Sequence, residues 1–213
     1  MYSSGLARKD GGLFSKELPK DGNRSWKVTT RPVQEPVSLD KTKLFSRITT
    51  VAEDSLIEDF IVSARMAAEE YMGRALITQT ITTVLDFWPG QKILLPRPPL
   101  ISVDGIFIID EDDEETEYDS DSYSLNTIAE PGQIIIKRGA TPPTNTTRDY
   151  GRYIIRSKHG YGTEQEDVPM PIRESIMLWT GVIYATRQID PKNPPPEVKN
   201  KLDMYKTVGV TVR

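Results

Sequence analysis

The sequence predicts an α+β protein: a helical domain of two main helices plus short helices, an antiparallel β-hairpin or small sheet, an extended N-terminal arm and a C-terminal tail. Three observations lead to this fold class. Apolar residues recur with helical spacing across residues 54–72, and an almost wholly apolar helical segment follows Pro169. Between these segments, short runs rich in Thr, Ile and Val alternate with Gly and Pro turns, which is typical of antiparallel strands.

The first main helix carries a continuous apolar stripe. Its members are Leu56, Ile57, Phe60, Ile61, Ala64, Ala67, Ala68, Tyr71 and Met72. The opposite, polar face consists of Glu58, Asp59, Ser63, Arg65, Glu69 and Glu70. Ser55 with Glu58 fits a capping box, and Gly73 can end the helix in the left-handed conformation. We therefore expect a surface helix that begins near Ser55 and ends at Gly73.

The strands follow this helix. Residues 78–87 form the first, and the turn at 88–91 joins it to a short strand at 92–95 as a hairpin. The prolines of 96–99 make the next segment an edge or a crossover. The remaining expected strands are residues 101–109, 118–125, 133–137 and 150–157.

Further helices flank this sheet. A short one is expected over 39–48, with Ser38 or Asp40 as its cap. The second main helix covers 172–185, and since it is apolar nearly all round, it either packs beneath the first helix or forms a subunit interface. After a proline-rich break at 190–196, Val198, Leu202 and Tyr205 share one face of a last short helix.

The sequence predicts three parts: an extended arm (1–36), a body (37–190) and a C-terminal tail (191–213). Charge changes near the same boundaries. Residues 1–36 carry seven basic and four acidic side chains, and residues 187–213 carry six and three, so each end has a net charge of +3. Residues 37–186 hold 14 basic and 24 acidic side chains, a net charge of −10. Basic ends on an acidic body indicate an assembly component, although such ends can also serve solubility alone.

The arm lacks a sustained apolar period and is expected to become ordered only on a partner. Its candidate anchors are Leu13, Phe14, Leu18 and Trp26.

Several classes of function find no support in the residues. The chain has no cysteine, and His159 is its one histidine, which we expect in a turn, so neither a His-based triad nor a two-histidine metal site can form. Phosphate-binding glycine motifs are absent. No apolar run approaches the ~18 residues of a membrane helix, and the start lacks a signal-peptide core. We expect a soluble protein that is not an enzyme and has no cofactor, metal or membrane partner.

An acidic loop interrupts the predicted sheet. Its members are Asp110, Glu111, Asp112, Asp113, Glu114, Glu115 and Glu117. Such a density of carboxylates could hold Ca²⁺ or Mg²⁺ in a metal-dependent DNA-processing accessory, but the EF-hand spacing is missing. Between two strands, a solvated hairpin turn is the favoured interpretation of the run. The acidic body argues against a nucleic-acid reader, so DNA would pass without being gripped.

Several motifs resemble the head-tail connector (adaptor) proteins of tailed bacteriophages and related particles. The most specific are Gly73-Arg74-Ala75-Leu76-Ile77 and Leu95-Pro96-Arg97-Pro98-Pro99-Leu100. Residues 86–90, the Gly-Tyr-Gly turn at 160–162 and residues 168–176 support them in the same order, so the resemblance covers residues 38–205. The long N-terminal arm and the acidic loop depart from the family pattern.

The resemblance implies a virion-neck protein that is present in the host cytoplasm during assembly. About a dozen copies would form a ring under the portal protein, contact the next tail or stopper protein and surround passing DNA. A stopper or tail-terminator ring is the alternative within this class. The tail would provide the grip on the portal, and the predicted docking residues are Val198, Leu202, Tyr205, Lys206, Val208, Val210 and Arg213.

Overall fold

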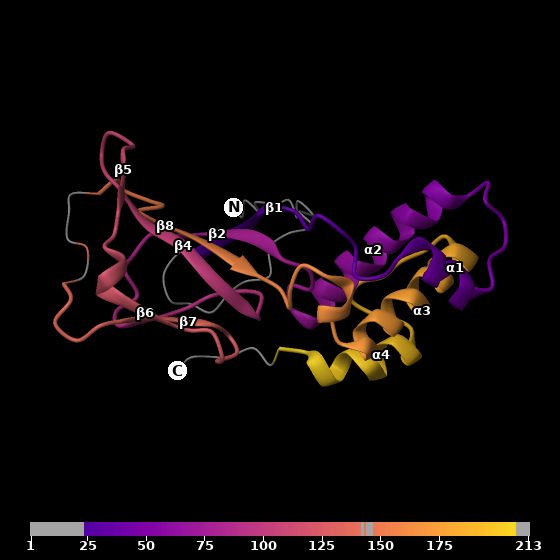
Figure 1. Cartoon of the computed structure of the whole chain (residues 1–213). Coiled ribbons are helices and arrows are strands. Elements are labelled where there is room, and N and C mark those ends of the chain that lie inside the picture. Colours follow the sequence, from indigo (N-terminus) through magenta and orange to yellow (C-terminus); the bar gives the residue numbers. More distant parts are fainter. Residues whose placement is uncertain (1–23, 142, 144–146, 208–213) are drawn as a thin grey trace, which may run out of the picture.

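Helices and strands occupy opposite ends of the molecule (Figure 1). The computed structural model describes residues 24–141, 143 and 147–207. The helices are α1 (Leu39–Ser46), α2 (Asp54–Met72), α3 (Met170–Thr186) and α4 (Pro196–Leu202). The strands are β1 (Arg24–Thr30), β2 (Gln79–Leu85), β3 (Lys92–Leu94), β4 (Leu100–Ile109), β5 (Glu115–Glu117), β6 (Tyr123–Asn126), β7 (Gln133–Ile136) and β8 (Tyr153–His159). This arrangement confirms the predicted α+β class.

The helical end is built on the packing of α2 against α3. Ile57, Ile61 and Ala64 of α2 are buried in one cluster with Ile176 and Trp179 of α3. Because α1 and α4 cover α3 from other directions (Figure 1), most of its apolar surface is shielded by its own subunit, while Val182 and Ala185 near its end are exposed. The predicted pairing of the two main helices as a core is therefore confirmed.

Local signals set most helix ends. Gly73 adopts φ 71° and ends α2, as its sequence position predicts. The Ser38 hydroxyl accepts a hydrogen bond from the Lys41 amide at the start of α1. The predicted capping box at Ser55 is wrong, because α2 begins one residue earlier and Glu53 occupies its cap position without a side-chain bond.

Two antiparallel sheets form the β end. The larger has the strand order β1-β2-β8-β4-β5, and the smaller has the order β3-β7-β6. Their facing sides enclose a second core, in which Ile106 and Ile155 of the larger sheet are buried with Ile93 and Ile134 of the smaller. Most pairings join strands that are distant in the chain, such as Thr83 of β2 opposite Ile155 of β8.

The predicted hairpin of residues 78–87 and 92–95 is wrong. β2 is flanked by β1 and β8, so both of its edges are already paired. β3 instead pairs with β7 in the other sheet, with Ile93 opposite Ile134. The turn at 88–91 is therefore a crossover between the sheets, a distinction that local sequence does not make.

Part of the predicted N-terminal arm belongs to the larger sheet. Residues 24–30 form β1 in the sheet of their own subunit, with Trp26 opposite Thr83 of β2. Trp26 also lies under the guanidinium of Arg97, 4.9 Å from its ring centroid. Trp26 is thus an intramolecular contact rather than an anchor for a neighbour. The other predicted anchors, Leu13, Phe14 and Leu18, lie outside the described residues.

Candidate functional site

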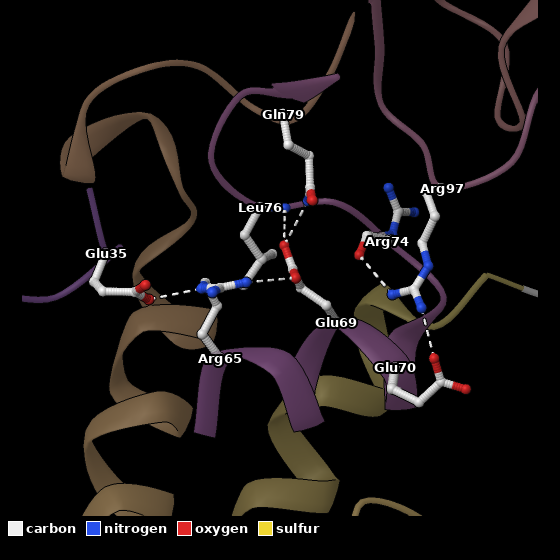
Figure 2. Close-up of polar contacts among 8 residues, drawn as sticks. All are labelled: Glu35, Arg65, Glu69, Glu70, Arg74, Leu76, Gln79 and Arg97. Atoms are coloured by element: carbon white, nitrogen blue, oxygen red, sulfur yellow. Dashed lines mark hydrogen bonds and ion pairs between the residues drawn. The ribbon is translucent and has the colours of Figure 1, made fainter. Parts of the chain in front are cut away.

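The helical end and the β end meet at a cluster of paired charges, which we call the joint (Figure 2). Its centre is the pair Arg65 and Glu69, one turn apart on α2, with 2.8 Å between Arg65 Nη1 and a Glu69 carboxylate oxygen. Each residue is 6% exposed. The prediction that both lie on the polar, outer face of the helix is wrong. Glu69 binds the segment that leads into β2, and Arg65 is paired with Glu35.

Glu69 connects α2 to the strand that follows it. Its second carboxylate oxygen accepts hydrogen bonds from the Leu76 amide and from Gln79 Nε2, both at 2.9 Å. Burial raises the pKa of Glu69, whereas Arg65 and the Leu76 amide act in the opposite direction. Three donors offset part of the cost of burying the Glu69 carboxyl group, and they hold the start of β2 against the end of α2.

Arg65 connects the same helix to the preceding segment. Its Nε donates to Glu35, 2.6 Å away, in the stretch that leads from β1 to α1. Glu35, Arg65 and Glu69 therefore form a continuous chain of charges across two segments of the sequence. A buried arginine with two carboxylates fixes direction as well as distance, because its donors lie in one plane.

Arg97 provides a second connection. It adopts φ 54° in the loop between β3 and β4 and pairs with Glu70 of α2 at 2.5 Å. The same guanidinium covers Trp26, and the Arg97 carbonyl accepts from His159 Nδ1 at 3.0 Å. One residue thus touches α2, β1 and β8, which explains why a strained backbone is tolerated there.

Arg74 provides a third connection, just beyond Gly73. Its guanidinium makes a bidentate pair with Glu130 of the β6–β7 loop. Its Nε also donates to the carbonyl of Tyr205, near the end of the described chain. Arg74 therefore links the smaller sheet to the C-terminal helix.

The two most specific sequence motifs meet at this joint. The amide of Ala75 donates to the carbonyl of Pro98 at 3.1 Å, and Arg97 Nη1 donates to the carbonyl of Arg74 at 3.4 Å. Leu76 and Ile77 are buried. Sequence reasoning missed the joint itself. One signal was present, since Arg65 and Glu69 stand four residues apart among the small residues Ala64, Ala67 and Ala68.

The structure does not bring the predicted docking residues together on a free surface. Val198 and Leu202 are 1% and 0% exposed, and both belong to the core of the helical end. Tyr205 packs against that core, and Lys206 Nζ lies 4.1 Å from the ring centroid of Tyr71. The docking prediction is therefore wrong for Val198 and Leu202, because α4 completes its own subunit. Val208, Val210 and Arg213 lie outside the described residues.

The acidic loop is the turn of the β4–β5 hairpin, with Ile109 opposite Glu115. It points away from the helical end (Figure 1). Asp113 pairs with Arg148 at 2.8 Å and Glu115 with Arg156 at 2.7 Å. Among the residues that the structure describes, no three carboxylate or histidine groups converge in a way that could hold a metal ion. The loop thus matches the hairpin-turn interpretation.

The prediction that His159 lies in a turn is wrong. The residue ends β8 and is fully buried. Its Nδ1 donates to the Arg97 carbonyl, which can only accept, so its Nε2 accepts from the Ser157 hydroxyl at 2.8 Å. Burial lowers the pKa of His159 to about 4, and the bond to Arg97 opposes this shift. A neutral histidine fixed on both sides serves the joint as a structural group.

None of the helices in the described part of the chain is long and apolar enough to cross a membrane.

The fold and the joint define a class: an α+β structural protein whose helical end and β end are coupled into one body. Residues 36–137 match the sequence model of the family described as Phage gp6-like head-tail connector protein, which confirms the resemblance inferred from the motifs. This segment begins before α1, ends just after β7 and contains both motifs that meet at the joint. Among curated proteins, none matches the chain in sequence.

Solved structures share the fold over nearly their whole length. A chain from the neck of an empty gene transfer agent particle, determined with C6 symmetry, has a TM-score of 0.75 at 20% identity and covers 89% of this chain and 98% of its own. A chain from the virion of a native gene transfer agent particle has a TM-score of 0.73 at 21% identity, with coverages of 88% and 98%. A chain from the neck of a native particle, with C12 symmetry, has a TM-score of 0.63 at 22% identity, with coverages of 87% and 98%.

Proposed function

We propose that this chain is a structural adaptor of a particle neck, where a ring of copies joins the portal to the next tail or stopper ring. The observation that carries the proposal is the pair of comparisons above: a connector-family segment within a fold shared, end to end, with chains from necks of C6 and C12 symmetry. Its role is structural rather than catalytic. It acts in the virion neck and passes through the host cytoplasm during assembly.

The joint suits this role. A connector transmits load between a head and a tail, so its two ends must keep a fixed relative orientation. Here Arg74 and Arg97 each bind partners across the boundary between the helical end and the β end. Arg65 acts through Glu69, which it pairs with and whose other oxygen binds Gln79 of β2. Because each of these arginines makes at least two hydrogen bonds, bending at the boundary would break several of them at once.

The negative charge of the body suits a channel for DNA. Residues 37–186 carry a net charge of −10. A lumen wall of the same sign as DNA repels the phosphates and lets the duplex slide without a binding site. We assign DNA passage, rather than DNA recognition, to the ring.

The C-terminal tail remains the segment proposed to bind the portal, but only the residues after Thr207 are proposed to make the contact. The Thr207 amide and hydroxyl bind the Met72 carbonyl at 2.8 and 2.9 Å, so residue 207 is fixed at the end of α2. Val208, Val210 and Arg213 follow this fixed point and combine apolar and basic character. A segment of this composition can dock by strand pairing, and many copies in a ring would reinforce each weak contact.

A deletion experiment tests the function. Particles made without this chain should contain DNA-filled heads with portals but without tails, and supplying the chain should restore tails. Crosslinking in complete particles then separates two positions in the neck. An adaptor crosslinks to the portal, whereas a stopper or tail terminator crosslinks to other neck proteins. Tailed, infectious or DNA-delivering particles in the absence of the chain would show that the proposal is wrong.

A further inference from the structure

The larger sheet ends in two strands of opposite charge. Among the strands that the structure describes, β1 is one edge of the sheet and β5 is the other. At the first edge, Lys27 on the strand and Arg31 just after it are exposed, and neither forms an ion pair among the described residues. At the second, Glu111, Asp112 and Glu114 are exposed in the turn that leads into β5, and they too form no ion pair within the described chain. We call these the β1 edge (residues 24–31) and the β5 edge (residues 111–117).

Edge strands are able to pair with another chain, because one side of their backbone has no neighbour in the sheet. The residues of β1 from Lys27 to Thr30 are all exposed, and so are the three residues of β5. Charge decides which pairing is favoured. Two β1 edges would bring lysine and arginine side chains together, and two β5 edges would bring carboxylates together, so like edges repel.

Unlike edges attract, and their geometry fits a ring. The β1 and β5 edges are different surfaces on opposite sides of one sheet, so a contact between them is head to tail. Head-to-tail contacts close into rings when the rotation between copies permits, whereas a contact between identical surfaces stops at a dimer. We propose that neighbouring copies join through these edges, the basic β1 edge of one copy against the acidic β5 edge of the next. The inference rests on the proposed ring and names the surfaces that form it.

This proposal gives the acidic loop a role in the contact between neighbouring copies. Within the subunit, Asp113 pairs with Arg148 and Glu115 pairs with Arg156, and these ion pairs hold the turn in place. The exposed carboxylates of Glu111, Asp112 and Glu114 are available for the basic side chains of a neighbour.

Charge reversal on the full-length protein tests the contact. Lys27→Glu with Arg31→Glu should weaken association of the purified chain at least tenfold, as measured by sedimentation or native mass spectrometry at low salt. Glu111→Lys with Glu114→Lys should do the same, and mixing the two variants should restore mixed rings. The matched control is Lys92→Glu with Lys192→Glu, two exposed lysines without an ion pair in the described part of the chain. Raising the salt concentration should weaken the wild-type contact.

Crosslinking inside particles gives an independent measurement. The sequence contains no cysteine, so Thr29→Cys on β1 with Thr116→Cys on β5 introduces the only reactive thiols. A short bis-maleimide should convert the double variant into a ladder of oligomers, while each single variant stays monomeric on a denaturing gel. If particles carry the chain in their necks but show neither the ladder nor sensitivity to charge reversal, the edge contact is wrong and the connector function stands. If the chain is absent from necks, the proposed function itself fails.

Discussion

The amide of Ala75 and the carbonyl of Pro98 are hydrogen-bonded at 3.1 Å, although 23 positions separate them in the chain. This bond joins the segment that leaves α2 to the proline-rich segment that enters β4. Around it, Arg74 and Arg97 extend in different directions to the smaller sheet and to α2. The two stretches that resemble connector proteins most closely are therefore two sides of one structural feature.

Removing one partner of the buried pair Arg65 and Glu69 should lower the free energy of unfolding more than neutralising both partners. Arg65→Met leaves the Glu69 carboxylate buried without its cation and should lower the free energy of unfolding by about 3 to 5 kcal/mol. Adding Glu69→Gln should recover part of this loss, because a neutral amide can still accept from the Leu76 amide. Urea unfolding of the single and double variants measures both effects.

A surface pair provides the control. Lys41 and Glu166 lie 3.5 Å apart, with side chains 59% and 67% exposed. Lys41→Met should therefore cost less than about 1 kcal/mol. Equal costs for Lys41→Met and Arg65→Met would contradict the view that burial makes the joint strong.

The packing of α2 on α3 should depend on Ile61. Its side chain is 2% exposed within the helical core, so Ile61→Ala should lower the free energy of unfolding by about 2 to 5 kcal/mol. Ile128→Ala removes the same atoms from a side chain that is 94% exposed and should change stability little. Substituting Phe60, which also belongs to the apolar stripe, would test this core less well, because its side chain is only half-buried and lies beside Arg187. Thermal unfolding that is unchanged in Ile61→Ala would rule out this core.

Truncations should separate stability from docking. Ending the chain after Asp190 removes Val198 and Leu202, both buried, and should destabilise the subunit by several kcal/mol, at about 2 to 5 kcal/mol per lost large apolar side chain. Ending it after Thr207 leaves α4 in place and should preserve the melting temperature. If residues 208–213 grip the portal, this second truncation should fail to join DNA-filled heads. Normal neck occupancy after it would place the grip on the body.

Acid should destabilise the protein through His159. Its pKa is about 4 in the folded state, against about 6.5 in the unfolded chain. Between these values the unfolded state binds the extra proton, so stability is full above pH 6.5 and falls as the pH drops toward 4. From pH 7 to pH 5 the loss should be about 2 kcal/mol.

The variant His159→Gln isolates this effect, because the chain has no other histidine. Its stability at pH 7 can differ from wild type, but its dependence on pH between 7 and 5 should be about 2 kcal/mol weaker. Urea unfolding at the two pH values provides the comparison. Parallel pH profiles for the two proteins would show that His159 does not titrate as its burial requires.

Sequence by itself determined the elements whose causes are local. The apolar period of residues 54–72, Gly73 at its end and Ser38 at the start of α1 act within a few residues, so the helices were placed within a residue or two. The motifs around Arg74 and Arg97 also identified the connector family. The alternation of Thr, Ile and Val located most strands, but not their partners.

Tertiary structure decided what depends on distant parts of the chain. Whether β3 pairs with β2 or β7, and whether Trp26 contacts a neighbour or its own sheet, follows from edges formed far away in sequence. Arg65 and Glu69 carry a polar signature, yet both are buried, because segments outside α2 supply their partners. These partners are Glu35 for Arg65, and Leu76 and Gln79 for Glu69. Likewise, the sequence shows Val198 and Leu202 as one apolar stripe, but it does not show whether that stripe faces a partner protein or α3. Burial is a property of the assembled fold, and here it is long-range packing that turned expected surface residues into the joint and the core.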